Sequence, residues 1–281
     1  MLSGKSRVAG VMGWPVEHSR SPRLHGYWLD KHGIDGTYIP MAVPPDRLEQ
    51  ALRALPALGL RGVNLTVPHK ETALLVCDQI DPLARRIGAV NTVVVGPDGA
   101  LQGSNTDAFG LIENLRRNSD WRADDGPAVI LGAGGAARSA CVALIDAGVE
   151  SIRIVNRTAG RASELAGAMA PHCEAIAWDR REESLAGAAL VINTTTLGMT
   201  GQPPLEIRLD ALPGSATVYD IVYAPLETSL LAAARARGNP AVDGLGMLLH
   251  QARPGFEAWF GVRPDVDEDL RDFVLQDLLV D

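Results

Sequence analysis

Val129-Ile-Leu-Gly-Ala-Gly-Gly-Ala-Ala-Arg138 joins an apolar run to a glycine-rich turn and the start of a helix. Gly132, Gly134 and Ala137 occupy the three positions of a dinucleotide-binding fingerprint, with alanine in the tolerated third place. The first glycine permits a sharp turn, the second lets the backbone approach a pyrophosphate, and the alanine lets the helix pack closely on the strand. The N–H groups at the start of such a helix bind phosphate. The sequence therefore predicts a dinucleotide-binding unit of strand, helix and strand over residues 128–131, 136–147 and 151–156.

The residues that end the second predicted strand indicate which dinucleotide is bound. NAD-binding proteins usually place Asp or Glu there, where the carboxylate accepts a hydrogen bond from the ribose 2′-hydroxyl. This chain instead has Asn156 and Arg157, with Arg161 one helical turn further on. A guanidinium pairs with a 2′-phosphate through two parallel hydrogen bonds, whereas a carboxylate repels it. The sequence predicts NADP as the cofactor; the alternative is that Arg157 and Arg161 are solvated surface residues.

The overall composition argues against several classes of partner. The net charge is −8 over 281 residues, which disfavours nucleic acid and an anionic membrane surface. Cys77, Cys141 and Cys173 form no C-x-x-C pair, which fits free thiols in a reducing cytoplasm. The N-terminus lacks an apolar signal core, and no apolar run of about twenty residues occurs. We therefore expect a cytoplasmic monomer or homodimer without a membrane segment, which acts on a small molecule.

Strand-like and helix-like segments alternate along the chain, which predicts the α/β class with mainly parallel sheets. The segments expected before residue 105 are strands over Arg7–Gly13, Thr37–Val43 and Gly62–Thr66, and helices that begin at Pro22, Asp46 and Lys70. The fingerprint unit continues through strands over 175–177, 189–193 and 217–221, and the pattern becomes helical after Gly244.

This pattern predicts two domains. The first is an N-terminal, mainly parallel α/β domain over residues 1–106, to which the C-terminal helices of 244–281 return. The family resemblance described below implies that this domain binds the substrate and carries the catalytic residues. The second is a Rossmann-type dinucleotide-binding domain over residues 107–243.

Two serines near the N-terminus are candidates for binding an anion. Ser19 and Ser21 are two residues apart, so in an extended segment both hydroxyls face one side. The pair Ser21-Pro22 is also typical of a helix start, with the serine as N-cap and the proline at the first helical position. A helix N-terminus attracts a carboxylate, so the two serines form a candidate carboxylate receptor. The alternative is that Ser21 only caps its helix.

A second candidate group surrounds Lys70. Alternation places Asn64 and Thr66 on one face of a strand end, and Lys70 is expected to begin the next helix. A lysine at a helix start meets the positive end of the helix dipole, so a negative partner is expected. Asp107 is that partner if the two strand ends lie side by side, and a lysine ammonium can act as a general acid. The alternatives are a solvated Lys70 and an Asp107 that only caps its helix.

Taken together, these motifs resemble the shikimate dehydrogenase family. The matching segments, from about Gly10 to Gln251, are G-x-P-x-x-H-S-x-S-P, N-x-T-x-P-x-K, A-V-N-T, N-T-D-x-x-G, G-A-G-G-A-x-R, N-R-T, N-T-T-x-x-G-M, D-I-V-Y-x-P-x-x-T and D-G-x-G-M-L-L-x-Q. The resemblance implies reversible hydride transfer between NADP and the 3-position of shikimate, with 3-dehydroshikimate as the oxidised partner. It also implies a role in aromatic amino-acid biosynthesis, by way of chorismate.

The resemblance implies a role for each matched residue. Lys70 and Asp107 are the implied catalytic pair. The implied substrate contacts are Ser19, Ser21, Asn64, Thr66, Lys70, Asn91, Asp107, Tyr223 and Gln251. The expected cofactor contacts are Gly132, Ala133, Gly134, Gly135, Ala136, Asn156, Arg157, Thr158, Arg161, Thr195, Ile221, Gly244 and Met247. No metal is implied, and the six histidines show no metal-binding spacing.

One departure and several rival interpretations remain. The family often has Asn after the histidine of the substrate loop, where this chain has Gly26. A quinate/shikimate dehydrogenase that uses NAD is the nearest alternative, and the pair Asn156-Arg157 argues against it. A non-catalytic dinucleotide sensor predicts loss of Lys70 or Asp107, and both are present. A folate or glutamyl-tRNA reducing enzyme would not need the paired serines.

Overall fold

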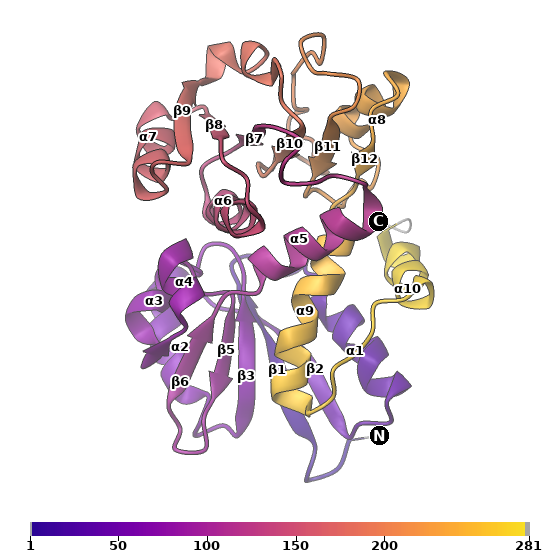
Figure 1. Ribbon diagram of the computed structural model, residues 1–281. Helices are drawn as coiled ribbons and strands as arrows, with labels where there is room; N and C mark the ends of the chain where they lie inside the picture. The colour runs from indigo at the N-terminus through magenta and orange to yellow at the C-terminus, as the bar shows by residue number, and fades with distance from the viewer. Residues whose placement is uncertain (1, 279–281) are drawn as a thin grey trace. The chain divides into compact units, whose positions relative to one another are not determined.

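The computed structural model describes residues 2–278 and divides into two compact units (Figure 1). Unit 2 comprises residues 108–247, and unit 1 comprises the described segments before and after it. The domain expected over 1–106 and 244–281 includes residue 1 and residues 279–281, which lie outside the described part of the chain. The assignment of a substrate-binding role to one unit and a cofactor-binding role to the other stays a prediction.

Unit 1 is built on a six-stranded mixed sheet in the order β2-β1-β3-β5-β6-β4. Its strands are β1 (Arg7–Gly13), β2 (Gly36–Ala42), β3 (Leu60–Leu65), β4 (Gln79–Ile80), β5 (Thr92–Val95) and β6 (Leu101–Ser104). β1 pairs in parallel with β2 and β3, and β4 pairs in parallel with β6. β5 runs antiparallel to both of its neighbours, which alternation along the sequence did not indicate.

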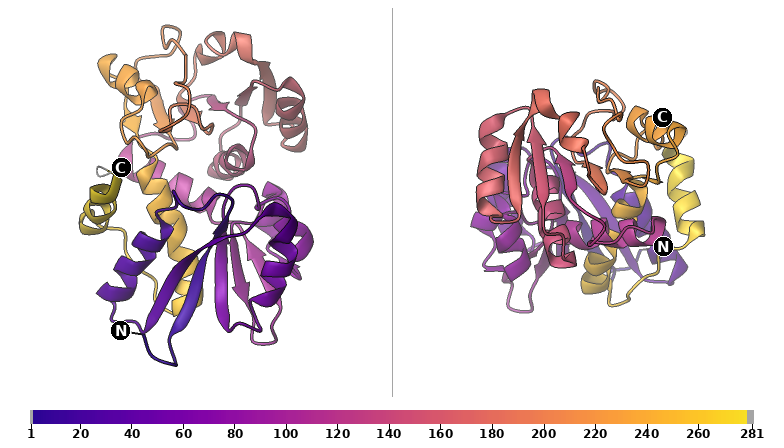
Figure 2. Two further views of the ribbon diagram at one scale, coloured as in Figure 1. Left: turned by 180° about the vertical axis from the view of Figure 1, so that it is seen from behind. Right: turned by 45° about the horizontal axis from the view of Figure 1, so that its top comes forward.

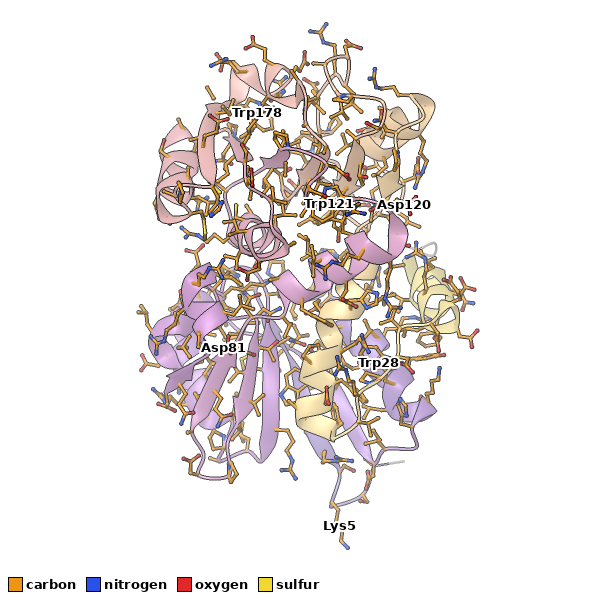
Figure 3. The ribbon with its side chains drawn as sticks, in the orientation of Figure 1. Lys5, Trp28, Asp81, Asp120, Trp121 and Trp178 are labelled. Atoms are coloured by element: carbon orange, nitrogen blue, oxygen red, sulfur yellow. The ribbon has the colours of Figure 1, made fainter. Side chains whose placement is uncertain are left out.

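Helices cover both faces of this sheet. They are α1 (Ser21–Lys31), α2 (Leu48–Ala54), α3 (Ala73–Val76), α4 (Pro82–Ile87), the last part of α9 (Leu245–Phe260) and α10 (Glu268–Leu278). Leu52 of α2 and Val76 of α3 belong to one apolar cluster with Val63 of β3, and the rear view in Figure 2 shows α2 in front of the strands. On the other face, Trp28 of α1 (Figure 3) packs against Phe256 of α9, with ring centroids 5.3 Å apart.

All three expected helix starts in unit 1 differ from the structure. At the start expected at Asp46, Pro45–Arg47 form a short 3₁₀ helix, and α2 begins only at Leu48. The helix expected from Lys70 begins only at Ala73, and Lys70 itself lies in a turn, because Pro68 and the following residues form turns rather than a helix. The argument from the helix dipole therefore does not apply to Lys70. Ser21 is not an N-cap but the first residue of α1; the cap position is Arg20, without a capping side-chain hydrogen bond.

Unit 2 is a doubly wound parallel sheet in the order β12-β11-β10-β7-β8-β9. The strands are β7 (Ala128–Leu131), β8 (Ile152–Asn156), β9 (Cys173–Ala177), β10 (Leu190–Asn193), β11 (Thr217–Asp220) and β12 (Ala241–Val242). The helices are α5 (Asp107–Asn118), which begins at the last residue before unit 2, α6 (Gly135–Ala147), α7 (Ala159–Ala168), α8 (Ser229–Ala236) and the start of α9. All four residues of β7 are buried.

The strand order reverses at β7, since β8 and β9 lie on one side of it and β10 to β12 on the other. In open α/β sheets, ligands bind at such a reversal, outside the carboxyl ends of the strands. The strands and helix expected around the fingerprint are confirmed, and so is the α/β fold class. Among the described helices, none is long and apolar enough to cross a membrane. The three cysteines form no disulfide.

Candidate active site

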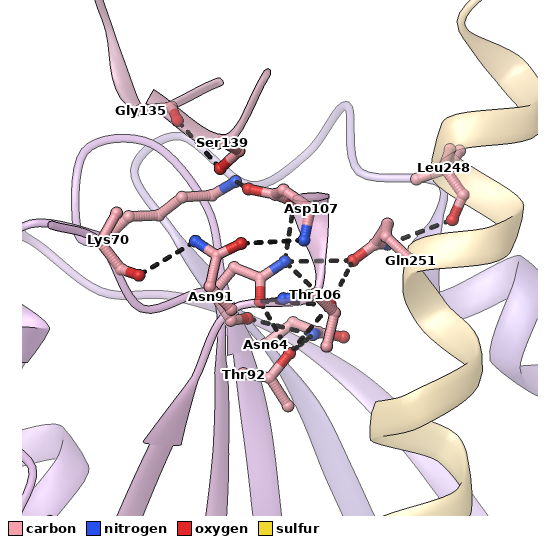
Figure 4. Close-up of polar contacts among 12 residues, drawn as sticks. Asn64, Lys70, Asn91, Thr92, Thr106, Asp107, Gly135, Ser139, Leu248 and Gln251 are labelled. Atoms are coloured by element: carbon pink, nitrogen blue, oxygen red, sulfur yellow. Dashed lines mark hydrogen bonds and ion pairs between the residues drawn. The ribbon is translucent and has the colours of Figure 1, made fainter. Parts of the chain in front are cut away.

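An ion pair lies where the loop after β3 meets the start of α5 in unit 1 (Figure 4). Lys70 Nζ lies 2.5 Å from Asp107 Oδ2. The Lys70 side chain is 23% exposed and that of Asp107 only 7%, so the lysine is the partner that solvent or a ligand can reach. Val90 N donates to Lys70 O at 2.8 Å, which holds the loop in place. The structure therefore brings together the two residues expected to form the catalytic pair, although Lys70 lies in a turn rather than at a helix start.

Asn91 holds the second oxygen of the carboxylate. Its Nδ2 donates to Asp107 Oδ1 at 2.7 Å, and its Oδ1 accepts from Thr106 N at 2.8 Å. Gln251, which reaches this network from α9, places Oε1 3.4 Å from Asn91 Nδ2. Because both ends of the Asn91 amide are bonded, its orientation is determined. Lys70, Asn91, Asp107 and Gln251 thus form one network, which also includes Thr106, a residue that the sequence analysis did not assign to the site.

Asn64 is buried close to this network. Its Nδ2 donates to Asn91 O and to Thr92 Oγ1, both at 3.1 Å, and its Oδ1 accepts from Tyr38 Oη at 2.7 Å. Thr66, two residues on, is half-buried where β3 ends. Tyr38 was missed by the sequence analysis, because an aromatic residue in a strand is typical of a core and carries no site signal of its own.

The two serines lie at the start of α1. Ser21 N donates to Ser19 Oγ at 3.4 Å, so the two residues are neighbours in space. Ser21 is 7% exposed, whereas Ser19 is half-buried. The Ser21 hydroxyl forms a hydrogen bond with the Tyr38 hydroxyl instead of capping its helix. The serines are therefore positioned by the fold, and their ability to receive a carboxylate stays a prediction.

In unit 2 the fingerprint loop fits a dinucleotide pyrophosphate. Gly132 has φ +116°, and a Cβ there would lie 2.5 Å from Thr194 Oγ1, so only glycine is accommodated. A Cβ on Gly134 or Gly135 would meet nothing within 4 Å, which leaves open space beside the start of α6. The N-cap residue is Gly134, which has no side chain, so no side-chain group caps the first N–H groups of α6. This helix start therefore offers N–H groups and space to a phosphate. Ala133 lies in the loop before α6, and Ala136 is the second residue of the helix.

The end of β8 carries the residues expected to select the cofactor. Asn156 Nδ2 donates to Thr158 O at 3.0 Å, which shapes the turn into α7. Arg157 and Arg161 are exposed on that turn and on the first turn of α7. An exposed pair of guanidinium groups without an intervening carboxylate suits a phosphate dianion rather than a ribose hydroxyl.

Asp220 is a buried carboxylate at the end of β11. It accepts hydrogen bonds from the end of β10 and from the loop after β11. Its Oδ1 accepts from Asn193 Nδ2 at 2.9 Å and from Val222 N at 3.0 Å, and its Oδ2 accepts from Thr228 Oγ1 at 2.7 Å. Asn193 Oδ1 in turn accepts from Thr195 Oγ1 at 2.7 Å. Burial raises the pKa of Asp220 from 3.8 to about 6. Asp220 belongs to one of the sequence motifs, but its burial could not be predicted from the motif.

The remaining expected residues lie on loops of unit 2, except Met247, which lies in the first turn of α9. Ile221 and Tyr223 follow β11 and are half-buried. A Cβ on Gly244 would lie 2.1 Å from Ile221 O, so glycine is required where the chain passes that loop. Met247 is 9% exposed in α9. Residues 2–278 contain no group of three or more His, Cys, Asp or Glu side chains that could hold a metal ion.

Known proteins match the chain along most of its length. Three family models match: "Shikimate dehydrogenase substrate binding domain" over residues 11–93, "Shikimate / quinate 5-dehydrogenase" over 115–199 and "Shikimate 5'-dehydrogenase C-terminal domain" over 244–270. The shikimate dehydrogenase (NADP(+)) of Rhodospirillum rubrum is 63% identical over 280 residues, which cover 98% of this chain and 99% of the relative.

The chain belongs to the shikimate dehydrogenase family.

Two solved structures of similar proteins show the same fold. The shikimate 5-dehydrogenase of Thermus thermophilus, solved with NADP(H) and shikimate, has a TM-score of 0.86 and 36% identity, and the match covers 96% of this chain and 99% of that one. The quinate dehydrogenase of Corynebacterium glutamicum, solved with NAD, has a TM-score of 0.89 and 30% identity, with coverage of 96% and 99%. Likeness of fold therefore does not separate the two substrate and cofactor pairs, and the family membership expected from the motifs is confirmed.

Proposed function

We propose that this chain is an NADP-dependent shikimate dehydrogenase that reversibly reduces 3-dehydroshikimate to shikimate. The observation that carries the proposal is the Lys70–Asp107 ion pair, held by Asn91 within a network of amide and hydroxyl groups. Such a network can bind several hydroxyl groups of a small polyol and supply one proton. Within the family, this reaction serves the biosynthesis of aromatic amino acids.

All the proposed substrate contacts except Tyr223 are polar groups of unit 1. Ser19 and Ser21 receive the carboxylate of the substrate at the start of α1. Asn64, Thr66 and Asn91 hold its ring hydroxyls. Gln251 from α9 and Tyr223 from the loop after β11 complete the set of contacts. The bonds among Asn64, Asn91 and their neighbours support this assignment, because they leave these side chains ordered before any ligand arrives.

The cofactor is NADP, which supplies the hydride when it is bound as NADPH. The loop of residues 132–134 and the N–H groups of Gly135 and Ala136 at the start of α6 hold the pyrophosphate. Asn156, Thr158 and the guanidinium groups of Arg157 and Arg161 hold the 2′-phosphate. The loops that carry Thr195, Ile221 and Gly244, together with Met247 at the start of α9, surround the nicotinamide. The Asp220–Asn193–Thr195 hydrogen bonds support the order of that region.

Lys70 acts as the general acid in reduction. Addition of a hydride to the carbonyl carbon leaves negative charge on the substrate oxygen, and the Lys70 ammonium donates its proton to that oxygen. Asp107 holds the ammonium in place through Oδ2, while Asn91 holds Oδ1. In the reverse direction the neutral Lys70 amine accepts the proton of the substrate hydroxyl. No step requires a metal ion.

The nearest alternative is a dehydrogenase that oxidises quinate with NAD. The assay that separates the two crosses two acids, shikimate and quinate, with two cofactors, NADP and NAD, and records reduced nicotinamide by absorbance. We expect the highest kcat/KM with shikimate and NADP. A higher kcat/KM with quinate and NAD would contradict the proposal, and no turnover of any pair would favour a non-catalytic sensor. A cytoplasmic location, and action as a monomer or homodimer, are also parts of the proposal.

A further inference from the structure

Tyr38 joins two of the side chains proposed to bind substrate. It lies in β2, and the residue is 5% exposed. Its Oη donates to Asn64 Oδ1 at 2.7 Å, and the Ser21 hydroxyl forms a hydrogen bond with the same Oη. One buried hydroxyl group therefore connects the proposed carboxylate receptor with a proposed receptor of a ring hydroxyl.

The register of the sheet explains how Tyr38 reaches Asn64 across an intervening strand. In β1, Ala9 pairs with Tyr38 on one side and with Gly62 on the other. Because side chains alternate along a strand, Tyr38, Ala9 and Asn64 share one face of the sheet. Ala9 has only a methyl side chain, so β1 places no large side chain between Tyr38 and Asn64 on this face.

The ring of Tyr38 is held by aromatic neighbours. It stacks on His25 with ring centroids 3.9 Å apart and an angle of 4° between the ring planes. The ring centroid of Trp259 lies 5.9 Å from that of Tyr38. His25 is fully buried, and neither of its ring nitrogens has a hydrogen-bond partner. Burial lowers the pKa of His25 to about 3, so the imidazole is neutral and packs as a flat aromatic ring. The Tyr38 hydroxyl therefore has little freedom to move.

This hydroxyl determines which end of the Asn64 amide a ligand meets. Both N–H groups of Asn64 are already used, one by Asn91 O and one by Thr92 Oγ1. Oδ1 accepts from Tyr38 and keeps one further lone pair. Asn64 can therefore offer a ligand only a hydrogen-bond acceptor, which suits a hydroxyl donor.

We propose that Tyr38 is a positioning residue for substrate binding, which holds Asn64 as an acceptor and keeps it at a set separation from Ser21. The inference rests on the proposed function, since it assigns Asn64 and Ser21 to the substrate. It predicts that Tyr38 contributes to the recognition of an acid that carries a ring hydroxyl at one defined distance from its carboxylate. Tyr38 does not take part in proton transfer, which belongs to Lys70.

The first test is Tyr38→Phe, which removes only the hydroxyl. We expect the KM for shikimate to rise by about three- to tenfold, the effect of one neutral hydrogen bond, with kcat and the KM for NADP unchanged. The matched control is Tyr27→Phe, because Tyr27 is a half-buried residue of α1 that packs on Phe273. We expect the control to leave all three constants unchanged. A fall in kcat together with a rise in both KM values would indicate general damage to the fold and would overturn the inference.

The second test asks whether Tyr38 acts through Asn64. Neighbouring residues that act as one unit give non-additive effects. We therefore expect Tyr38→Phe to raise the KM by a smaller factor when Asn64 is already alanine than it does in the wild type. Independent, multiplying effects of the two substitutions would overturn the inference. The wild-type rate of shikimate oxidation, measured in the same assay, separates this inference from the proposed function. If the wild type does not oxidise shikimate, both are overturned. If the wild type oxidises shikimate and Tyr38→Phe leaves the KM unchanged, only the inference about Tyr38 is overturned.

Discussion

Lys70 Nζ and Asp107 Oδ2 lie 2.5 Å apart although 37 positions separate the two residues in the chain. The pair depends on two different elements, the loop after β3 and the start of α5, and on Asn91, which holds the other carboxylate oxygen. The lysine side chain is the more exposed of the two. This arrangement keeps the ammonium accessible while its charge is balanced, as a general acid requires.

Replacement of Lys70 by alanine should lower kcat by about 10²- to 10⁴-fold and change the KM for shikimate much less, because a general acid acts mainly in the transition state. The measurement is steady-state oxidation of shikimate with NADP. Lys5→Ala, which removes an exposed lysine of the same unit, is the control and should be as active as the wild type. A large rise in KM with unchanged kcat would instead assign Lys70 to binding.

Replacement of Arg157 by alanine should raise the KM for NADP by about tenfold or more and leave the KM for NAD unchanged, because a charge-assisted hydrogen bond to the 2′-phosphate is lost. The control is Arg122→Ala, which changes the net charge by the same amount as Arg157→Ala. Arg122 is also an exposed residue of unit 2. Equal weakening of both cofactors by Arg157→Ala would mean that the 2′-phosphate is held elsewhere.

Asp220 should make the stability of the protein depend on pH. Its pKa is raised from 3.8 to about 6, so the folded protein binds this proton more tightly than the unfolded chain does. The resulting stabilisation is complete below pH 3.8 and is lost as the pH rises through about 6. Asp220→Asn removes this titration and should keep the shape of the side chain.

The measurement is the melting temperature of the wild type and of Asp220→Asn between about pH 4 and about pH 7. We expect the wild type to lose stability relative to the variant as the pH rises. The loss is up to about 3 kcal/mol, at about 1.4 kcal/mol for each unit of pKa shift between 3.8 and about 6. Asp179→Asn, at an exposed position of unit 2, should show no such change. A difference that stays constant with pH would contradict the prediction.

Gly26→Ala should stabilise the protein by about 1 kcal/mol, because glycine is a poor helix former and this position lies inside α1. A Cβ there would meet nothing within 4 Å. Gly62→Ala is the contrasting variant: φ is +150° and the Cβ would lie 2.0 Å from Val93 O, so we expect strong destabilisation. Thermal unfolding measures both, and a lower melting temperature for Gly26→Ala would show that this glycine has a role the packing does not reveal.

The strand, helix and strand around Gly132 could be predicted from the sequence because each depends on local signals. A short apolar run, a glycine-rich turn and small residues in the helix all lie within one continuous segment. The helix start expected at Lys70 is wrong because the conformation there depends on a contact with a distant part of the chain. The turn after Pro68 is held by the bond from Val90 N to Lys70 O, which joins segments twenty residues apart and which no local pattern displays.

By itself, the sequence determined the family, the α/β class and the dinucleotide-binding unit, and it predicted a preference for NADP, because these follow from motifs of adjacent residues. Only the tertiary structure decided which side chains meet: Lys70 with Asp107, Asn91 with Gln251, and Tyr38 with both Ser21 and Asn64. Strand order and register bring these distant positions within hydrogen-bond distance. Burial, which raises the pKa of Asp220 and lowers that of His25, likewise depends on the whole fold rather than on any neighbouring residue.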